Sequence, residues 1–366
     1  MTSIAAGQSQ LPASSALRGL HEAALLLQSE GLRVPTWTAI LAGDPPPVPR
    51  ADDADPGERT KGWQQLASNA REEFELASFR AAADGSTNAR LHSCAGPQAA
   101  RWMTAMPTED ALKMDDTEFR TAMLRRLALP IDPLCSRCEG CGATTDPQGH
   151  HRACCMLTGR VHARHKSIAQ GPWVQVLREA GVPVPRKNIE RLLHTTHINR
   201  GRGDQRRMDI ITPGIPEVCR GTPLFLDATC VSPLHANGTP MPQAAGTPGI
   251  VLQRADRKNR ERDYPDVEAS PHATFLSLSV ETFGRWGEQS LMLVNQLARY
   301  KAASAPLQLR SVTHTAYASR WWALLSVAVQ KAVAQTLVRQ GGPDLLSEPS
   351  ALEPPTLVDV LDHQRP

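Results

Sequence analysis

The sequence lacks the long apolar runs of a membrane protein. No stretch of about 18 apolar residues is free of charge, so no membrane-spanning helix is predicted. The opening run MTSIAAGQSQLPASS has no basic segment followed by an apolar core, so no signal peptide is predicted. No internal repeat is present, so no repeat architecture is predicted.

The chain also has little net charge, +3 from 40 Lys and Arg against 37 Asp and Glu. The total therefore says little about a nucleic-acid partner, but the distribution says more. Residues 152–207 hold many Arg, Lys and His with few acids, whereas residues 44–82 and the C-terminal tail are acidic. A basic block of this kind can face phosphate groups. A solvated basic face without a partner is the alternative interpretation.

The length of 366 residues permits two or three domains. The hydrophobic content of 41% allows a packed core, and the 30 Pro and 25 Gly cluster in loops and linkers. Periodicity and capping residues predict most of the secondary structure. The main predicted segments are a helix from Trp63 to about Ala83, a helix over TEFRTAMLRRLAL capped by Asp115 or Asp116, a helix over 167–180, a mobile loop over 233–253, a helix over 254–264, a strand over 274–282, and helices over 288–302 and 318–339.

Cysteine is scarce and clustered, since four of the eight lie within residues 138–155. Cys138 and Cys141 form a C-x2-C knuckle, and His151 and Cys155 form an H-x3-C pair. Three thiolates and one imidazole suit a tetrahedral zinc ion. Four protein ligands leave no open position for a substrate, so the predicted zinc has a structural role.

The ligand register of this cluster has alternatives. Cys135 could replace Cys138, and His150 with Cys154 could replace the second pair. A turn with free thiols and no metal is the simplest alternative.

Two aspartates stand in or beside short apolar runs that are typical of buried strands. Asp209 lies in RRMDIIT and Asp227 in LFLDATCV, and Lys258 follows in the basic stretch RADRKNRERDY. A buried carboxylate is usually paired or holds a metal. Two acids on neighbouring strands could hold Mg²⁺ or Mn²⁺ and activate water against a phosphodiester. Ordinary strand-end aspartates in turns are the alternative.

Together these motifs resemble the C-terminal part of non-LTR retrotransposon polyproteins of the restriction-like-endonuclease class. The resemblance covers about residues 60–340 and rests on the order of the motifs. The matching runs are GWQQLA, GPQAARWMTAMP, CGATTDPQGHHRACC, RVHARH, RRMD, LFLDATCVSPL, RADRKNRERDY, SLSVETFGRWG and SVAVQKAVAQTLVR.

The resemblance implies a PD-(D/E)XK nuclease core, a small mixed sheet flanked by helices. Asp209 and Asp227 would then bind the catalytic Mg²⁺ or Mn²⁺. Thr229 stands where many such nucleases keep Lys, so Lys258 from the following helix is the candidate catalytic lysine. Glu179 is either an additional metal ligand or solvent-facing. The residues expected to contact nucleic acid are Arg160, Arg164, His165, Arg206, Arg207, Arg262 and Tyr264, of which His165 is favoured as structural.

Two departures from the family stand out. Met208 occupies the place where the family usually has Pro, and no reverse-transcriptase motif is found. We therefore expect a fragment, a split product or a decayed copy of a longer element protein. The expected parts, within an α+β or α/β fold, are a poorly ordered region with one helix and a Pro-rich linker (1–60), a helical linker region (61–134), the zinc knuckle (135–160), the endonuclease core (161–303), a C-terminal helix (304–340) and a disordered tail (341–366).

The leading hypothesis is a nuclear, metal-dependent endonuclease that nicks target DNA so that a reverse-transcriptase partner can prime from the free end. Element RNA is a further expected partner, and no membrane is involved. A second hypothesis is a catalytically silent, zinc-containing nucleic-acid-binding remnant. A third is an interaction module in which the zinc knuckle joins two helical regions.

Overall fold

The computed structural model describes Glu22, Leu25, Gln28 and residues 63–132, 136–185, 189–192, 204–219 and 221–338. Two compact units, residues 1–84 and 85–366, are described separately. In the first unit, α4 (Trp63–Ala82) confirms the helix predicted there. The predictions for Cys135 and for residues 341–366, and most of those for residues 1–60, lie outside the described residues. None of the helices in the described ranges is long and apolar enough to cross a membrane.

The second unit combines helices with short strands. The strands are β1 (Arg191–Leu192), β2 (Arg207–Met208), β3 (Ile210–Thr212), β4 (Leu224–Val231) and β5 (Thr274–Glu281). The helices are α5 (Gly85–Cys94), α6 (Asp116–Arg126), α7 (His150–Cys154), α8 (Arg160–Ile168), α9 (Val174–Ala180), α10 (Pro216–Cys219), α11 (Ile250–Lys258), α12 (Pro265–Glu268), α13 (Glu288–Ala303) and α14 (Arg310–Val338). Short turns of helix are η1 (Arg101–Met103), η2 (Asp110–Leu112), η3 (Met156–Thr158) and η6 (Leu307–Leu309), and the π-helical turns are η4 (Ala169–Trp173) and η5 (Asn259–Asp263).

Three strands form a mixed sheet in the order β3-β4-β5. β3 runs antiparallel to β4, with Ile210 opposite Leu226, and β4 runs parallel to β5, with Asp227 opposite Ser277. A parallel pair needs a crossover connection, and α11 lies within it. A separate ladder pairs β1 with β2. This combination of helices and a small mixed sheet agrees with the expected α+β class.

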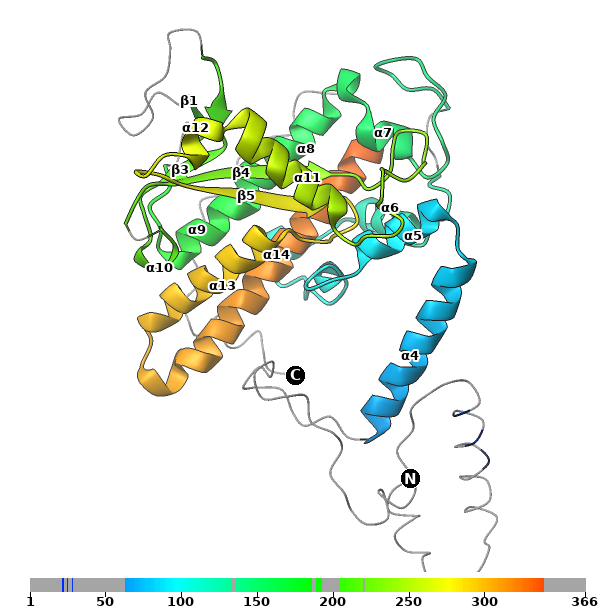
Figure 1. Ribbon diagram of the computed structural model, residues 1–366, viewed down its shortest axis with the longest axis horizontal. Coiled ribbons are helices and arrows are strands. Elements are labelled where there is room, and N and C mark those ends of the chain that lie inside the picture. Colours follow the sequence, from blue (N-terminus) through cyan, green and yellow to red (C-terminus); the bar gives the residue numbers. More distant parts are fainter. Residues whose placement is uncertain are drawn as a thin grey trace, which may run out of the picture. The chain divides into compact units, whose positions relative to one another are not determined.

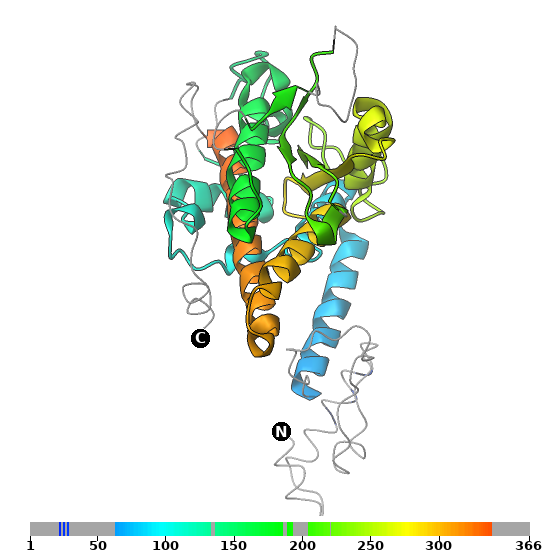
Figure 2. The same ribbon diagram turned by 90° about the vertical axis from the view of Figure 1, so that its left-hand side faces the viewer.

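One face of the sheet is apolar and faces the main core. Successive side chains of a strand point to opposite faces, so Leu224, Leu226 and Ala228 of β4 share one face with Leu276 and Leu278 of β5. All five are buried in the main hydrophobic cluster. α8, α9, α13 and α14 lie on this side of the sheet (Figures 1 and 2). The long α14 contributes buried residues along most of its length.

The opposite face is apolar at one end and polar in the middle. Phe225 and Phe275 form a small cluster with Met208 and Val267. Asp227 and Thr229 follow on β4, and Ser277 lies opposite Asp227 on β5. α11, η5 and α12 cover this face (Figure 1). Polar side chains of the strands are therefore buried between the sheet and a helix.

Local signals in the sequence account for several helix ends. Asp115, rather than Asp116, caps α6: its carboxylate accepts the Glu118 N–H at 2.7 Å, and the Glu118 carboxylate accepts the Asp115 N–H at 3.1 Å. The helix predicted over 167–180 is part of a longer run, α8-η4-α9, in which Pro172 lies in a π turn. α14 begins at Arg310, earlier than the predicted 318.

The segment expected to be a mobile loop is a series of hydrogen-bonded turns. The His235 N–H donates to the Thr239 carbonyl at 2.8 Å, and the Met241 N–H donates to the Pro233 carbonyl at 2.8 Å. α11 already begins at Ile250, after Gly249 in the left-handed region. The Gly and Pro residues of this segment thus shape specific turns.

Candidate metal centres

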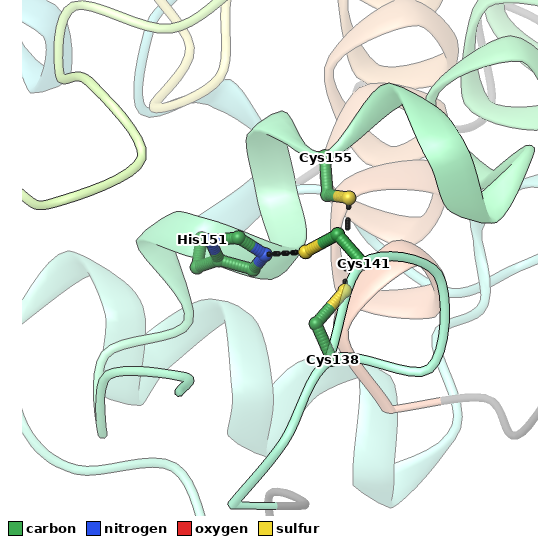
Figure 3. Close-up of side chains that lie close together, drawn as sticks. All are labelled: Cys138, Cys141, His151 and Cys155. Atoms are coloured by element: carbon green, nitrogen blue, oxygen red, sulfur yellow. Dashed lines mark hydrogen bonds between the residues drawn. The ribbon is translucent and has the colours of Figure 1, made fainter. Parts of the chain in front are cut away.

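The four predicted zinc ligands lie together. One ligand atom from each of Cys138, Cys141, His151 and Cys155 lies within 4.8 Å of the others. The Cys141 Sγ is 3.1 Å from the His151 Nε2, and the Cys138 and Cys155 sulfurs are 3.6 Å apart (Figure 3). The cluster could hold a metal such as zinc, as the spacing predicts.

Short-range turns position these ligands. The Cys138 N–H donates to the Ala143 carbonyl and the Gly142 N–H donates to the Cys138 carbonyl, each at 2.8 Å, which closes the knuckle. The Asp146 carboxylate accepts the N–H groups of His150 and His151 and so caps the start of α7. Cys155 follows His151 by one helical turn, so both side chains face the knuckle.

The electrostatics of the knuckle favour a thiolate. Burial opposes ionisation of Cys138, but hydrogen bonds from the backbone of Cys141 and Gly140 outweigh it and lower its pKa to about 6. Burial, together with the neighbouring thiols, raises the pKa of Cys155. A cation would stabilise thiolates at all three sulfurs, and the donor set of three sulfurs and one imidazole fits zinc. Because the protein supplies all four ligand atoms, a bound zinc would have no open position for a substrate.

The alternative pair, His150 and Cys154, has other neighbours. The ring of His150 lies against Gly238, where an added Cβ would come within 3.0 Å of it. The Cys154 Sγ donates to the Leu234 carbonyl at 3.7 Å. These contacts tie α7 to the turns that follow β4, and they leave His151 and Cys155 as the ligand pair.

Much of the basic run behind the knuckle is buried. The carboxylate of Glu139, between the two knuckle cysteines, forms ion pairs with Arg152 and Arg160. Arg160 also donates to the Thr336 carbonyl of α14 at 3.2 Å, and Arg164 donates to the Ala153 carbonyl of α7 at 2.9 Å. Arg160 and Arg164 were predicted to contact nucleic acid, but both are buried and hold the knuckle against its neighbours.

Asp209 lies in the bend between β2 and β3, and Asp227 lies on the adjacent strand β4. The β3-β4 ladder ends at Ile210 and Leu226, and one further step along it would place Asp209 opposite Asp227. Instead of continuing the ladder, the Asp209 Oδ2 accepts the Ala228 N–H of β4 at 2.8 Å. The same oxygen lies 3.2 Å from the His165 Nε2 of α8. Only 6% of Asp209 and 8% of Asp227 are exposed.

Three side chains hold the Asp227 carboxylate. The Tyr264 hydroxyl donates to Oδ1 at 3.1 Å, while the Thr229 hydroxyl at 3.0 Å and the Asn259 amide at 2.9 Å donate to Oδ2. Burial, followed by repulsion from Asp209, raises the pKa of Asp227 to about 6. Burial also raises the pKa of Tyr264, so this hydroxyl remains a donor. The hydrogen bond to Asp209 raises the pKa of His165.

The donor set of the aspartate pair fits a hard divalent cation. Carboxylate oxygens are the preferred ligands of Mg²⁺, which usually keeps several waters. The Asp209 Oδ1 accepts no hydrogen bond from the described residues, and a cation would offset the repulsion that raises the pKa of Asp227. In the part of the chain that the structure describes, the cysteine cluster is the one group of three or more Cys, His, Asp or Glu residues whose ligand atoms lie within 4.8 Å of one another. The pair would therefore share its cation with water.

The predicted lysine does not contact this pair. The Lys258 Nζ lies 3.3 Å from the Asp263 Oδ2, and its side chain is 52% exposed. The adjacent Asn259 contacts Asp227 in its place. Sequence reasoning missed Asn259, because the helical spacing from Val251 and Ala255 admits both position 258 and position 259 to the buried stripe. Lys258 was preferred for its charge, and the structure buries Asn259 instead.

The remaining predicted residues occupy the surroundings of the pair. Arg206 forms ion pairs with Asp204 and Asp266 and lies over the Tyr264 ring, 5.7 Å from its centroid. The side chains of Arg207 and Arg262 are 59% and 70% exposed. The latter two can reach an external phosphate, whereas Arg206 is engaged within the protein.

Glu179 is neither solvent-facing nor beside the aspartates. It is buried and accepts hydrogen bonds from Arg320 at 2.9 Å and from the Trp321 indole at 2.8 Å. Arg320 also pairs with Glu109. This network joins α9 to α14.

Comparisons of the chain with protein-family models, with curated proteins and with solved structures find no match. The functional conclusion therefore rests on the geometry of the two centres.

Proposed function

We propose that the protein is a metal-dependent DNA endonuclease whose cation is held by Asp209 and Asp227. The observation that carries the proposal is the pairing of two buried carboxylates, one just before β3 and one on the adjacent β4, the second with its pKa raised to about 6. Buried acids whose ionisation is disfavoured mark functional sites in many proteins. The mixed sheet with a helical crossover also supports the restriction-like nuclease core that the sequence motifs imply.

Each neighbouring side chain has a role in this proposal. Bound Mg²⁺ or Mn²⁺ lowers the pKa of a water ligand and offsets charge on the scissile phosphate. The Ala228 N–H and His165 fix the Asp209 carboxylate, and Tyr264 orients Asp227. Arg207, Lys258 and Arg262 are exposed cations that bind the phosphate backbone. The zinc knuckle stabilises the start of α8, which carries His165.

The biological setting follows from the motif resemblance. The protein would nick a nuclear DNA target and leave a free 3′ end from which a reverse-transcriptase partner copies element RNA.

The placement of Lys258 favours a second candidate, a catalytically silent nucleic-acid-binding protein. The group beside Asp227 is the neutral Asn259 amide, so no lysine ammonium stands next to the carboxylates in the described residues. Loss of one charge-stabilising group commonly costs about 10²–10³-fold in rate. Such a protein would keep the fold and the exposed cations and cut nothing.

A supercoiled-plasmid nicking assay separates the two candidates. The wild-type chain should nick with Mg²⁺ or Mn²⁺ and not in metal-free buffer. Asp209→Asn and Asp227→Ala should abolish nicking and leave DNA binding intact, because each removes a cation ligand without removing a cationic side chain. Lys258→Ala should reduce the rate less, by about 10²-fold at most.

The matched control is Asp256→Asn, because Asp256 lies on α11 and pairs with Arg260 instead of facing the sheet. It should nick like the wild type. A wild-type chain that binds DNA but never nicks would favour the silent protein. Nicking that survives in both aspartate variants would move the site elsewhere.

A further inference from the structure

The sheet-facing stripe of α11 ends in a polar residue. Val251, Leu252 and Ala255 are buried against the sheet side, and the helical spacing continues to Asn259, which is 4% exposed. An apolar residue is the ordinary occupant of such a position. Lys258 lies about 100° around the helix axis and reaches solvent. The helix therefore directs a neutral amide, and not the ammonium, at the sheet.

The Asn259 amide meets three acceptors on the polar sheet face. Its Nδ2 is 2.9 Å from the Asp227 Oδ2, 3.1 Å from the Ser277 Oγ and 3.3 Å from the Thr229 Oγ1. These three side chains share one face because Asp227 and Thr229 alternate along β4 and Ser277 is the register partner of Asp227. Burial of an amide is costly unless it is hydrogen-bonded, so these contacts fix its orientation.

The residue that ends the same π turn, Tyr264, is another donor to Asp227. Asn259 begins η5, and its carbonyl accepts the Tyr264 N–H at 2.7 Å. The Tyr264 hydroxyl then donates to the Asp227 Oδ1. The two oxygens of one carboxylate are thus held from the two ends of a single π turn, a conformation that is frequent at functional sites.

We infer that Asn259 is a positioning residue for the cation site: its amide sets the plane of the Asp227 carboxylate toward Asp209. The inference rests on the proposed function, since it assumes a cation between the two aspartates. Hydrogen-bond partners of metal ligands typically contribute about 10–100-fold to metal affinity. Asn259 would act through Asp227 without touching the cation or the DNA.

Mn²⁺ binding to the 366-residue, zinc-loaded chain tests this without DNA or catalysis. Titration calorimetry in metal-free buffer should give one Mn²⁺ site in the wild type and none in Asp209→Asn. Asn259→Leu keeps the branched shape of the side chain and removes the donor, so it should bind Mn²⁺ about 10–100-fold more weakly. The Mn²⁺ electron paramagnetic resonance spectrum should change in parallel.

The matched control is Gln289→Leu, which also replaces an amide beside Ser277. The Gln289 Oε1 accepts the Ser277 backbone N–H at 2.7 Å and so supports β5 without reaching Asp227. Its Mn²⁺ affinity should equal that of the wild type even if its unfolding midpoint falls. Ser277→Ala, which removes one acceptor of the Asn259 amide, should weaken Mn²⁺ several-fold.

The outcomes separate the inference from the proposed function. A folded Asn259→Leu that binds Mn²⁺ like the wild type would overturn the inference and leave the cation site intact. If Asn259→Leu fails to fold, unchanged affinity in Ser277→Ala overturns it instead. A wild-type chain without an Asp209-dependent Mn²⁺ site would remove the proposed function and the inference together.

Discussion

The cysteine cluster and the aspartate pair are assembled in different ways. Cys138 and Cys155 belong to one short stretch, and turns such as the Gly142 N–H to Cys138 carbonyl bond bring its ligands together. Asp209 and Asp227 depend on sheet register, and the groups that hold them come from α8 and from η5. One centre offers four ligand atoms and is rich in sulfur, whereas the other has two buried carboxylates that would share a cation with water. The first suits a permanent structural ion and the second an exchangeable one.

Removing the zinc should have the largest effect, because structural zinc contributes about 10–16 kcal/mol of apparent binding free energy at neutral pH. Cys138→Ser should lower the zinc content from one per chain to near zero. Hydrogen exchange should accelerate across residues 136–165, while α13 and α14 stay better protected. Metal analysis and exchange mass spectrometry check both.

Cys219→Ser is the control, because Cys219 is a buried thiol bonded to the backbone of Ile215 and lies outside the cluster. It should keep its zinc. If Cys138→Ser also keeps one zinc per chain, the assigned ligand set is wrong.

The aspartate pair should make stability depend on pH. The pKa of Asp227 is raised from 3.8 to about 6, so between these values the folded protein binds a proton that the unfolded chain has released. Stability should therefore fall by up to about 3 kcal/mol as pH rises through this window and then level off. The raised pKa of His165 adds a further decline above pH 6.5. Urea unfolding in cation-free buffer measures both.

The stability of Asp227→Asn should not decline between pH 4 and 6, so the variant should become more stable than the wild type as pH rises through this range. Saturating Mg²⁺ should restore the stability of the wild type and leave that of the variant unchanged. Glu281 offers a comparison, since it is also buried and burial raises its pKa. Glu281→Gln keeps both aspartates, so its gain in stability over the wild type at neutral pH should be the same with and without Mg²⁺. If Mg²⁺ stabilises Asp227→Asn as much as Glu281→Gln, there is no cation site at the pair.

The smallest expected effect concerns DNA affinity. Arg262→Ala should weaken duplex binding a few-fold and reduce the slope of log affinity against log salt by about 1, because it removes one exposed cation. Arg164→Ala should leave that slope unchanged and lower stability by about 1–3 kcal/mol, because the Ala153 carbonyl loses a buried donor. Anisotropy titrations at several salt concentrations and urea unfolding distinguish the two. A folded Arg164→Ala with a reduced slope would return this residue to the DNA-binding surface.

The contrast between the two centres also explains what the sequence could reveal. The clustering of the four predicted zinc ligands is confirmed, because their spacing and the turns between them are local. The neighbourhood of Asp209 and Asp227 was predicted from two apolar runs, but their partners were not. Lys258 was chosen by residue type, whereas the structure buries Asn259 toward the sheet. Arg160 and Arg164 look like surface cations in sequence and are buried because α7 and α14 pack on α8, which only the tertiary structure determines.

The hydrogen bond from the Ala228 N–H to the Asp209 carboxylate has a consequence for how such a chain would change under drift. The β3-β4 ladder ends at Leu226, and beyond it the Asp209 carboxylate, not a backbone carbonyl, accepts the Ala228 N–H of β4. Asp209 thus serves the sheet whether or not a cation binds, while the charge of Asp227 costs stability unless a cation offsets it. On the proposed function, a chain released from selection for nicking should lose Asp227 early and retain Asp209. Persistence of Asp209 alone would then mark an intact fold and not an active nuclease.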